Sequence, residues 1–170
     1  MKLTIRTYPD PVLAQKAAEI GEMTPALREL AANMAETMYG DSGIGLAAPQ
    51  VGESIRMVVV DVTGPENKAG LMTLINPRIV ASEGEVDSEE GCLSLPNLRC
   101  TVTRKERVTV QALDLDGKSV TIEADELLAV CLQHELDHLD GVILVDRISR
   151  LKRLLYDKKV KKWQKKATDD

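Results

Sequence analysis

Aromatic side chains are almost absent from this chain of 170 residues, which has one Trp, three Tyr and no Phe. A core built around aromatic rings is therefore excluded, although hydrophobic residues still make up 44% of the sequence. The interior has to be filled by Leu, Ile, Val, Ala and Met. We expect one domain with a tail, because a chain of this length can bury a proper core.

The sequence also lacks segments that would direct it to a membrane or an export pathway. It has no hydrophobic run of transmembrane length and no recognisable signal or transit peptide, so we expect a cytoplasmic protein with no membrane partner. Its three cysteines are an odd number without C-x-x-C spacing. They argue against a disulfide framework and for a reducing compartment.

Histidine is equally scarce, and the only two copies, His134 and His138, are four residues apart. On a helix these positions share one face, one turn apart, so both rings can hold the same metal ion. Glu135 follows the first of them and completes the H-E-x-x-H pattern, in which the carboxylate acts on a metal-activated water. Packed or solvated histidines are the alternative, but this spacing favours the metal.

The segment around these histidines has the pattern of a helix. Residues 124–139 contain no Gly or Pro and are rich in apolar residues. Asp125 and Glu126 would lie in the first turn, where negative charge suits the helix dipole, and Gly141 would end the helix. Such a helix is expected to be buried on several sides. Its polar groups then need partners, which a metal would supply.

A catalytic site of this kind needs a third protein ligand. No His follows His138 and no Glu follows Glu135, and Leu144 stands where a longer form of the motif has its third His. Asp140 and Asp146 are weakly placed as substitutes. We therefore expect the third ligand to lie upstream, with cysteine the natural candidate.

The three cysteines differ in their surroundings. Cys131 precedes His134 on the same predicted helix and is expected to be a small apolar residue or a pocket wall. Cys100 lies in a strand-like run and is expected to be a core or surface thiol. Cys92 differs from both, because it follows Gly91, which lets the backbone approach a neighbour closely.

Three segments in this order resemble the signatures of peptide deformylase. They are Gly43–Gln50 (G-I-G-L-A-A-P-Q), Glu90–Ser94 (E-G-C-L-S) and Gln133–His138 (Q-H-E-L-D-H). The family signatures are G-x-G-L-A-A-x-Q, E-G-C-L-S and H-E-x-D-H, and the resemblance spans nearly the whole chain. It implies a metal-dependent hydrolase that removes the N-formyl group from the formyl-methionine of newly made proteins and releases formate.

The resemblance also implies roles for individual residues. Cys92, His134 and His138 would bind the metal, and Glu135 would be the general base and acid. The side-chain amide of Gln50 and the backbone N–H of Leu93 would stabilise the oxyanion. Mixed thiolate and imidazole ligands suit Zn, Fe(II), Co or Ni, and the family implies Fe(II) physiologically, with Ni or Co as working replacements.

The substrate pocket should be apolar to accept a methionine side chain, with extended segments pairing with the peptide backbone. The candidate residues are Ile44, Gly45, Arg99, Leu127, Val130 and Cys131. Plain core packing is the alternative for Leu127 and Val130, and a solvated surface charge is the alternative for Arg99. Glu90 and Arg104 are expected to form a pair that steadies the Cys92 loop, or else an ordinary surface ion pair.

The remaining pattern predicts an α+β fold, with antiparallel β-sheets wrapped around the central metal-binding helix and a C-terminal helix. Thr24 caps a predicted helix with Pro25 at its first position. Residues 55–62 and 71–79 are predicted strands, and residues 106–124 a hairpin around Asp116-Gly117. Residues 1–148 are expected to form the catalytic part, and residues 149–170 a basic helix and tail of the same domain.

Charge is divided unevenly between these two parts. Residues 150–170 hold nine Lys and Arg against three Asp, a net of +6, whereas the other 149 residues hold 13 basic and 24 acidic groups, a net of −11. The default interpretation of the basic run is a solvated helix. The alternative, which the resemblance favours, is contact with the polyanionic ribosome; sequence-specific nucleic-acid binding is not expected.

Two other functions fit parts of the sequence. A metallopeptidase that cuts internal peptide bonds would share the helix motif but leave the two upstream segments unexplained. A catalytically silent, metal-stabilised binding module on the ribosome would not need Glu135 and Gln50.

Overall fold

Strands β1 (Gly45–Ala47) and β2 (Met57–Val60) are covered on both faces by helices, and the adjacent strand β3 (Met72–Glu83) is buried only in its first half. Side chains alternate across a strand, and in β2 Val58 and Val60 pack with the residues of helix α3 (Glu126–Leu139), whereas Met57 and Val59 pack with those of helix α1 (Pro25–Gly40). All four β2 side chains are fully buried. This two-sided burial explains the unbroken apolar run in the sequence.

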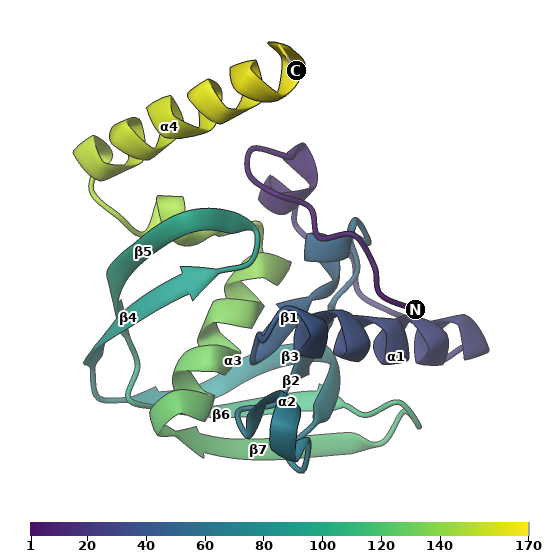
Figure 1. Ribbon diagram of the computed structural model, residues 1–170. Coiled ribbons are helices and arrows are strands. Elements are labelled where there is room, and N and C mark those ends of the chain that lie inside the picture. Colours follow the sequence, from purple (N-terminus) through teal and green to yellow (C-terminus); the bar gives the residue numbers. More distant parts are fainter. Residues whose placement is uncertain (170) are drawn as a thin grey trace.

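The computed structural model describes residues 1–169 and shows the metal-motif helix at the centre of the molecule (Figure 1). Strands β6 (Arg107–Leu113) and β7 (Ser119–Asp125) complete an antiparallel five-stranded sheet of order β1-β2-β3-β6-β7. Strands β4 (Val86–Cys92) and β5 (Leu95–Arg104) form a separate hairpin on the other side of α3. The predicted α+β class is confirmed.

Helix α3 begins two residues later than predicted. Ala124 and Asp125 belong to β7, where they pair with Val108 and Arg107 of β6, and Asp125 occupies the N-cap position. The expectation that Asp125 lies in the first turn is therefore wrong, because strand pairing outweighs the favourable helix composition at this end. The predicted stop is confirmed: Gly141 follows the helix with φ +75°.

The predicted strands are found with shifted ends. Residues 55–62 shorten to β2, and residues 71–79 lengthen to β3, which continues to Glu83 through two register irregularities. The hairpin of residues 106–124 is confirmed as β6 and β7. The loop between the two strands spans residues 114–118, so it is longer than a two-residue turn. Asp114 Oδ1 holds this loop by accepting hydrogen bonds from the backbone N–H groups of Asp116 and Lys118.

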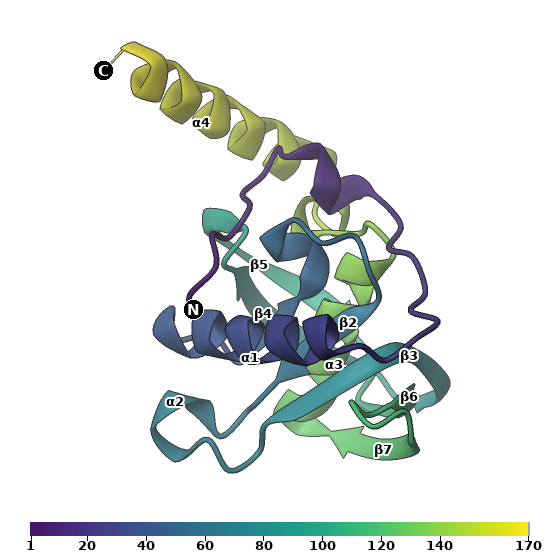
Figure 2. The ribbon, with the colours of Figure 1, turned by 90° about the vertical axis from the view of Figure 1, so that its right-hand side faces the viewer.

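The C-terminal helix α4 (Arg150–Asp169) extends away from the body of the molecule (Figure 2). Ser149 Oγ accepts the Lys152 N–H and caps its first turn. Tyr156 and Val160 are buried in a cluster that includes Leu13 and Leu95. The short helix α2 (Gly64–Asn67) and the 3₁₀ turns Pro11–Ala14, Ala48–Val51 and Leu144–Asp146 complete the elements. Within residues 1–169 no helix is both long and apolar enough to cross a bilayer.

Candidate metal centre

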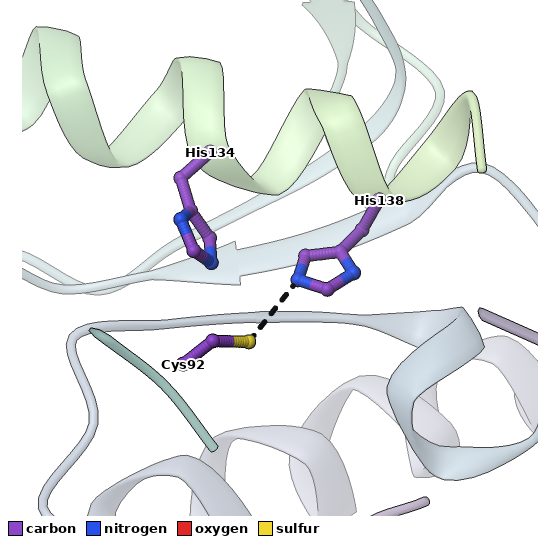
Figure 3. Close-up of side chains that lie close together, drawn as sticks. All are labelled: Cys92, His134 and His138. Atoms are coloured by element: carbon purple, nitrogen blue, oxygen red, sulfur yellow. Dashed lines mark hydrogen bonds between the residues drawn. The ribbon is translucent and has the colours of Figure 1, made fainter. Parts of the chain in front are cut away.

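The end of β4 brings Cys92 against two turns of α3. Gly91 pairs with Arg99, but Cys92 pairs with Leu95, so a register shift closes the hairpin within this segment. The sulfur then faces His134 and His138, and one ligand atom from each of the three residues lies within 4.8 Å of the others (Figure 3). Cys92 Sγ is 3.4 Å from His138 Nε2.

The two imidazoles are oriented as metal ligands require. His134 Nδ1 lies 3.0 Å from Glu90 Oε1, so a proton on Nδ1 leaves the Nε2 lone pair free. Burial lowers the pKa of His138 well below its usual value and keeps that ring neutral. One sulfur and two imidazole nitrogens in this space form a donor set that suits a divalent transition metal with an open position.

A buried ion-pair network holds the Glu90 carboxylate behind His134. Both Glu90 oxygens accept hydrogen bonds from Arg104, at 2.9 and 2.7 Å, and Arg104 Nη1 reaches Asp137 at 2.6 Å. Burial alone would raise the pKa of Glu90, but hydrogen bonds from Arg104 and His134 lower it to about 2. Arg104 is 4% exposed and Glu90 7%, so the predicted pair is confirmed and the surface-pair alternative is wrong.

Sequence reasoning missed the third member of this network. Asp137 lies within the motif on α3, just before His138, and accepts hydrogen bonds from Arg147 as well as from Arg104. Its position three residues after His134 places it near the same helix face, which is the signal that could have identified it.

Glu135 is the catalytic candidate that the helix aims into the same space. Its side chain is nearly fully buried, and burial raises its pKa to about 7 against the opposing effects of His134 and Arg104. Within residues 1–169, its Oε2 has no hydrogen-bond partner. Such a carboxyl group is suited to accept and return a proton near neutral pH.

Gln50 faces this cluster from the turn after β1. Its Oε1 accepts the Ala47 N–H at 2.9 Å, and its Nε2 donates to Ser94 Oγ at 3.1 Å while lying 3.6 Å from Cys92 Sγ. Leu93 directly follows Cys92, in the turn between β4 and β5. Both candidate oxyanion donors therefore lie beside the three metal-ligand candidates, and Ser94 is a further polar neighbour that the sequence did not single out.

A cavity of about 460 Å³ opens onto the cluster. It collects every predicted site residue except His138, which is 1% exposed and lies behind it. The predicted residues in its lining are Ile44, Gly45, Gln50, Cys92, Leu93, Arg99, Leu127, Val130, Cys131, His134 and Glu135. Ser42, Gly43, Ser88, Glu89, Glu90 and Gly91, which were not predicted as pocket residues, complete it.

For Leu127, Val130 and Arg99 the sequence allowed another role besides lining the pocket. Leu127 is 52% exposed at the cavity, so plain core packing is wrong for it, and the partly buried Val130 also lines the cavity. The Arg99 side chain is 65% exposed and lies 3.4 Å from Glu89. It is a solvated charge that also lines the cavity.

A buried carboxylate beside one thiol and two imidazoles, at the base of a cavity, defines a metal-dependent hydrolase by fold and site. The family model described as polypeptide deformylase matches residues 2–154. The chain therefore belongs to the peptide deformylase family, whose members are metal-dependent enzymes that remove the formyl group from nascent peptides.

Individual relatives agree with this assignment. The chain is 56% identical over 159 residues to a peptide deformylase of Thermodesulfovibrio yellowstonii, covering 94% of this chain and 96% of the relative. A crystal structure of a peptide deformylase from Legionella pneumophila is 41% identical, with a TM-score of 0.92 over 100% of this chain and 99% of that one. The Ehrlichia chaffeensis enzyme in complex with actinonin is 39% identical, with a TM-score of 0.89 over 95% and 96%.

Proposed function

We propose that Cys92, His134 and His138 bind one divalent metal ion and that this centre hydrolyses the N-formyl group of formyl-methionyl nascent peptides. The observation that carries the proposal is the convergence of the three donor atoms within 4.8 Å of one another. When bound, such a metal acts as a Lewis acid that lowers the pKa of water. The donor set and the reducing compartment suit Fe(II), with Ni, Co or Zn as substitutes in purified protein.

The surrounding side chains supply the proton transfers and the charge stabilisation. Glu135 takes a proton from the attacking water and returns one to the leaving amine, which frees formate and the peptide N-terminus. The Gln50 amide and the Leu93 N–H donate to the negative charge that develops on the formyl oxygen. One such donor contributes roughly 3–4 kcal/mol in comparable oxyanion holes.

The methionine side chain is proposed to enter the cavity against Ile44, Val130 and Cys131, with Leu127 at the rim. Strand β1 lies at one edge of the five-stranded sheet, and the segment leading into it lines the cavity. A peptide can add to that free edge through backbone hydrogen bonds. Recognition of the backbone would tolerate many sequences after methionine.

Formate release from formyl-Met-Ala-Ser by protein purified under argon tests this function. We expect turnover that depends on the loaded metal, measured by elemental analysis of the same sample, and almost no turnover by the Glu135→Gln variant with its metal retained. Near-full activity of that variant would reject the general-base role. Digestion of casein without formate release would instead identify a peptidase that cuts internal bonds.

We further propose that residues 1–148 hold all catalytic groups and that the basic helix in residues 149–170 contacts the ribosome in the cytoplasm. Truncation of α4 is a poor test, because Tyr156 and Val160 belong to a buried cluster. Replacing six exposed lysines by Gln leaves these contacts intact; they are Lys158, Lys159, Lys161, Lys162, Lys165 and Lys166. The variant should bind ribosomes more weakly at low salt and turn over small peptides normally. Unchanged binding would reject the contact.

A further inference from the structure

Ser94 is the only fully buried serine side chain in residues 1–169. It lies two residues after Cys92, in the turn between β4 and β5. Burying a hydroxyl group costs free energy unless it forms hydrogen bonds. The Ser94 Oγ has such a partner, because it accepts a hydrogen bond from Gln50 Nε2 at 3.1 Å. The hydroxyl therefore contacts the side chain that is proposed to bind the oxyanion.

This contact removes the remaining freedom of the Gln50 amide. Its oxygen is held by the Ala47 N–H at 2.9 Å, and one of its two N–H bonds is held by Ser94. The same nitrogen also donates to Cys92 Sγ at 3.6 Å, which directs the second N–H toward the cluster. Without Ser94 the amide nitrogen would keep only this long contact with sulfur, and its donor would be less well preorganised for charge that develops in the cavity.

Ser94 is itself held in place by the N-terminal segment. Its backbone carbonyl accepts the Tyr8 N–H at 2.8 Å, and the Gln50 carbonyl accepts the Arg6 N–H at 2.6 Å. Residues 6–8 thus tie together the turn that carries Gln50 and the hairpin turn that carries Cys92 and Leu93. The two proposed oxyanion donors come from separate elements, and this shared attachment fixes the distance between them.

We propose that Ser94 is a positioning residue for deformylation: it orients the Gln50 amide and does not itself touch the substrate. The proposal rests on the oxyanion role proposed for Gln50. A group that acts only in this way should change kcat and leave KM nearly unchanged, because the orientation matters most when charge develops on the formyl oxygen.

A double-mutant cycle tests the proposal on nickel-loaded enzyme with formyl-Met-Ala-Ser. Ser94→Ala should lower kcat by about tenfold, the worth of one ordered hydrogen bond, with metal content and KM nearly unchanged. In the Gln50→Ala background the same substitution should have almost no further effect. Thr37→Val is the matched control, because Thr37 is another fully buried hydroxyl, which accepts the Leu3 N–H and is not among the residues that line the cavity. It should reduce stability and leave kcat unchanged.

Several results would overturn the proposal. If Ser94 acts through Gln50, Ser94→Ala cannot lower kcat by the same factor in both backgrounds. An equal loss in both would therefore contradict the proposal, as would an unchanged kcat. Full kcat in Gln50→Ala alone would locate the failure in the oxyanion role instead. Should Ser94→Ala not fold, nuclear magnetic resonance of zinc-loaded wild-type protein decides: a slowly exchanging Gln50 side-chain amide supports the proposal, and a rapidly exchanging one overturns it.

Discussion

Arg104 places a positive charge in an almost fully buried position behind the metal-binding candidates. Its guanidinium pairs with Glu90 and Asp137, and Arg104→Met would leave both carboxylates without this partner. Removing one member of a buried ion pair costs about 3–5 kcal/mol, so the free energy of unfolding should fall by that amount. Metal affinity should fall by about 10- to 100-fold, because His134 loses its orientation.

Chemical unfolding and metal titration measure these two effects. Arg107→Met is the control, because Arg107 pairs with Glu83 at the surface, where both side chains are at least 60% exposed. Its effect on unfolding should stay within about 1 kcal/mol. Equal losses in the two variants would contradict the account of the buried network.

Gly45 allows the first strand to pass close to the catalytic carboxylate. A Cβ at this position would lie 2.9 Å from both Cys131 Sγ and Glu135 Cγ, so Gly45→Ala forces one of these side chains to move. We expect kcat for formate release to fall by roughly 100-fold, since small misplacements of reacting groups have that effect. Gly21→Ala, which meets nothing within 4 Å, should leave kcat unchanged.

Asp61, the residue after β2, is tied to helix α1 by the Tyr39 hydroxyl, and it does not line the cavity. Burial alone would raise its pKa, but hydrogen bonds from Thr63 and Tyr39 outweigh burial and hold the pKa below its ordinary value. The pKa of an aspartate in the unfolded chain is about 3.9. Because the pKa of Asp61 in the folded protein is lower, its ionised carboxylate stabilises the fold at pH values above about 3.9, and this contribution is lost as the pH falls through the pKa of the folded state.

Wild-type protein should therefore exceed Asp61→Asn in free energy of unfolding by about 1–3 kcal/mol at pH 7. The difference between the two proteins should shrink as the pH is lowered below about 4. Urea unfolding at a series of pH values measures it, and a gap that widens toward acid would contradict the assignment.

The identities of the site residues could be predicted from sequence because their types and spacing are chemically restrictive. Two histidines one helical turn apart, with a glutamate between them, leave few interpretations, and the Cys92 segment was recognised by its resemblance. Ser94 and Asp137 lie within the recognised segments, but their contacts could not be predicted, because these depend on how distant segments pack.

At the scale of elements, the stop of helix α3 depends on one glycine. Gly141 has φ +75°, and a Cβ there would lie 2.6 Å from the Ala14 carbonyl oxygen. Gly141→Ala should reduce the free energy of unfolding by more than about 2 kcal/mol, because backbone strain and a backbone clash act together. Gly117→Ala isolates the strain alone, since φ is +78° but the nearest atom is 3.7 Å away.

Thermal or urea unfolding of the two variants gives the comparison. The Gly141 variant should lose more stability than the Gly117 variant. Similar losses would show that the close contact with the Ala14 carbonyl does not add to the cost of the substitution.

Periodicity predicted the elements whose burial is regular and missed those whose burial is not. Helix α3 and the β6–β7 hairpin have clear patterns, and both are found. The β4–β5 hairpin was not predicted, because the buried positions of these strands include the charged residues Glu90 and Arg104. Their burial depends on each other and on His134, so no local pattern reveals it.

Over the whole molecule, three buried clusters form the core, one of them including residues of α3, and segments far apart in the chain meet at one cavity. The turn after β1, the end of β4 and the middle of α3 each supply part of the site. The sequence indicated which segments belong together only through chemistry and family resemblance. The hydrogen bonds that join residues 6–8 to two of these segments could not be predicted from the sequence.

The central claim is that the Cys92 sulfur and the two histidine rings share one metal ion, and X-ray absorption of zinc-loaded protein tests it most directly. The account predicts one sulfur ligand at about 2.3 Å and two imidazole nitrogens at about 2.0–2.1 Å. The sulfur signal should vanish in Cys92→Ser. A wild-type spectrum without sulfur, or an unchanged spectrum in that variant, would contradict the account.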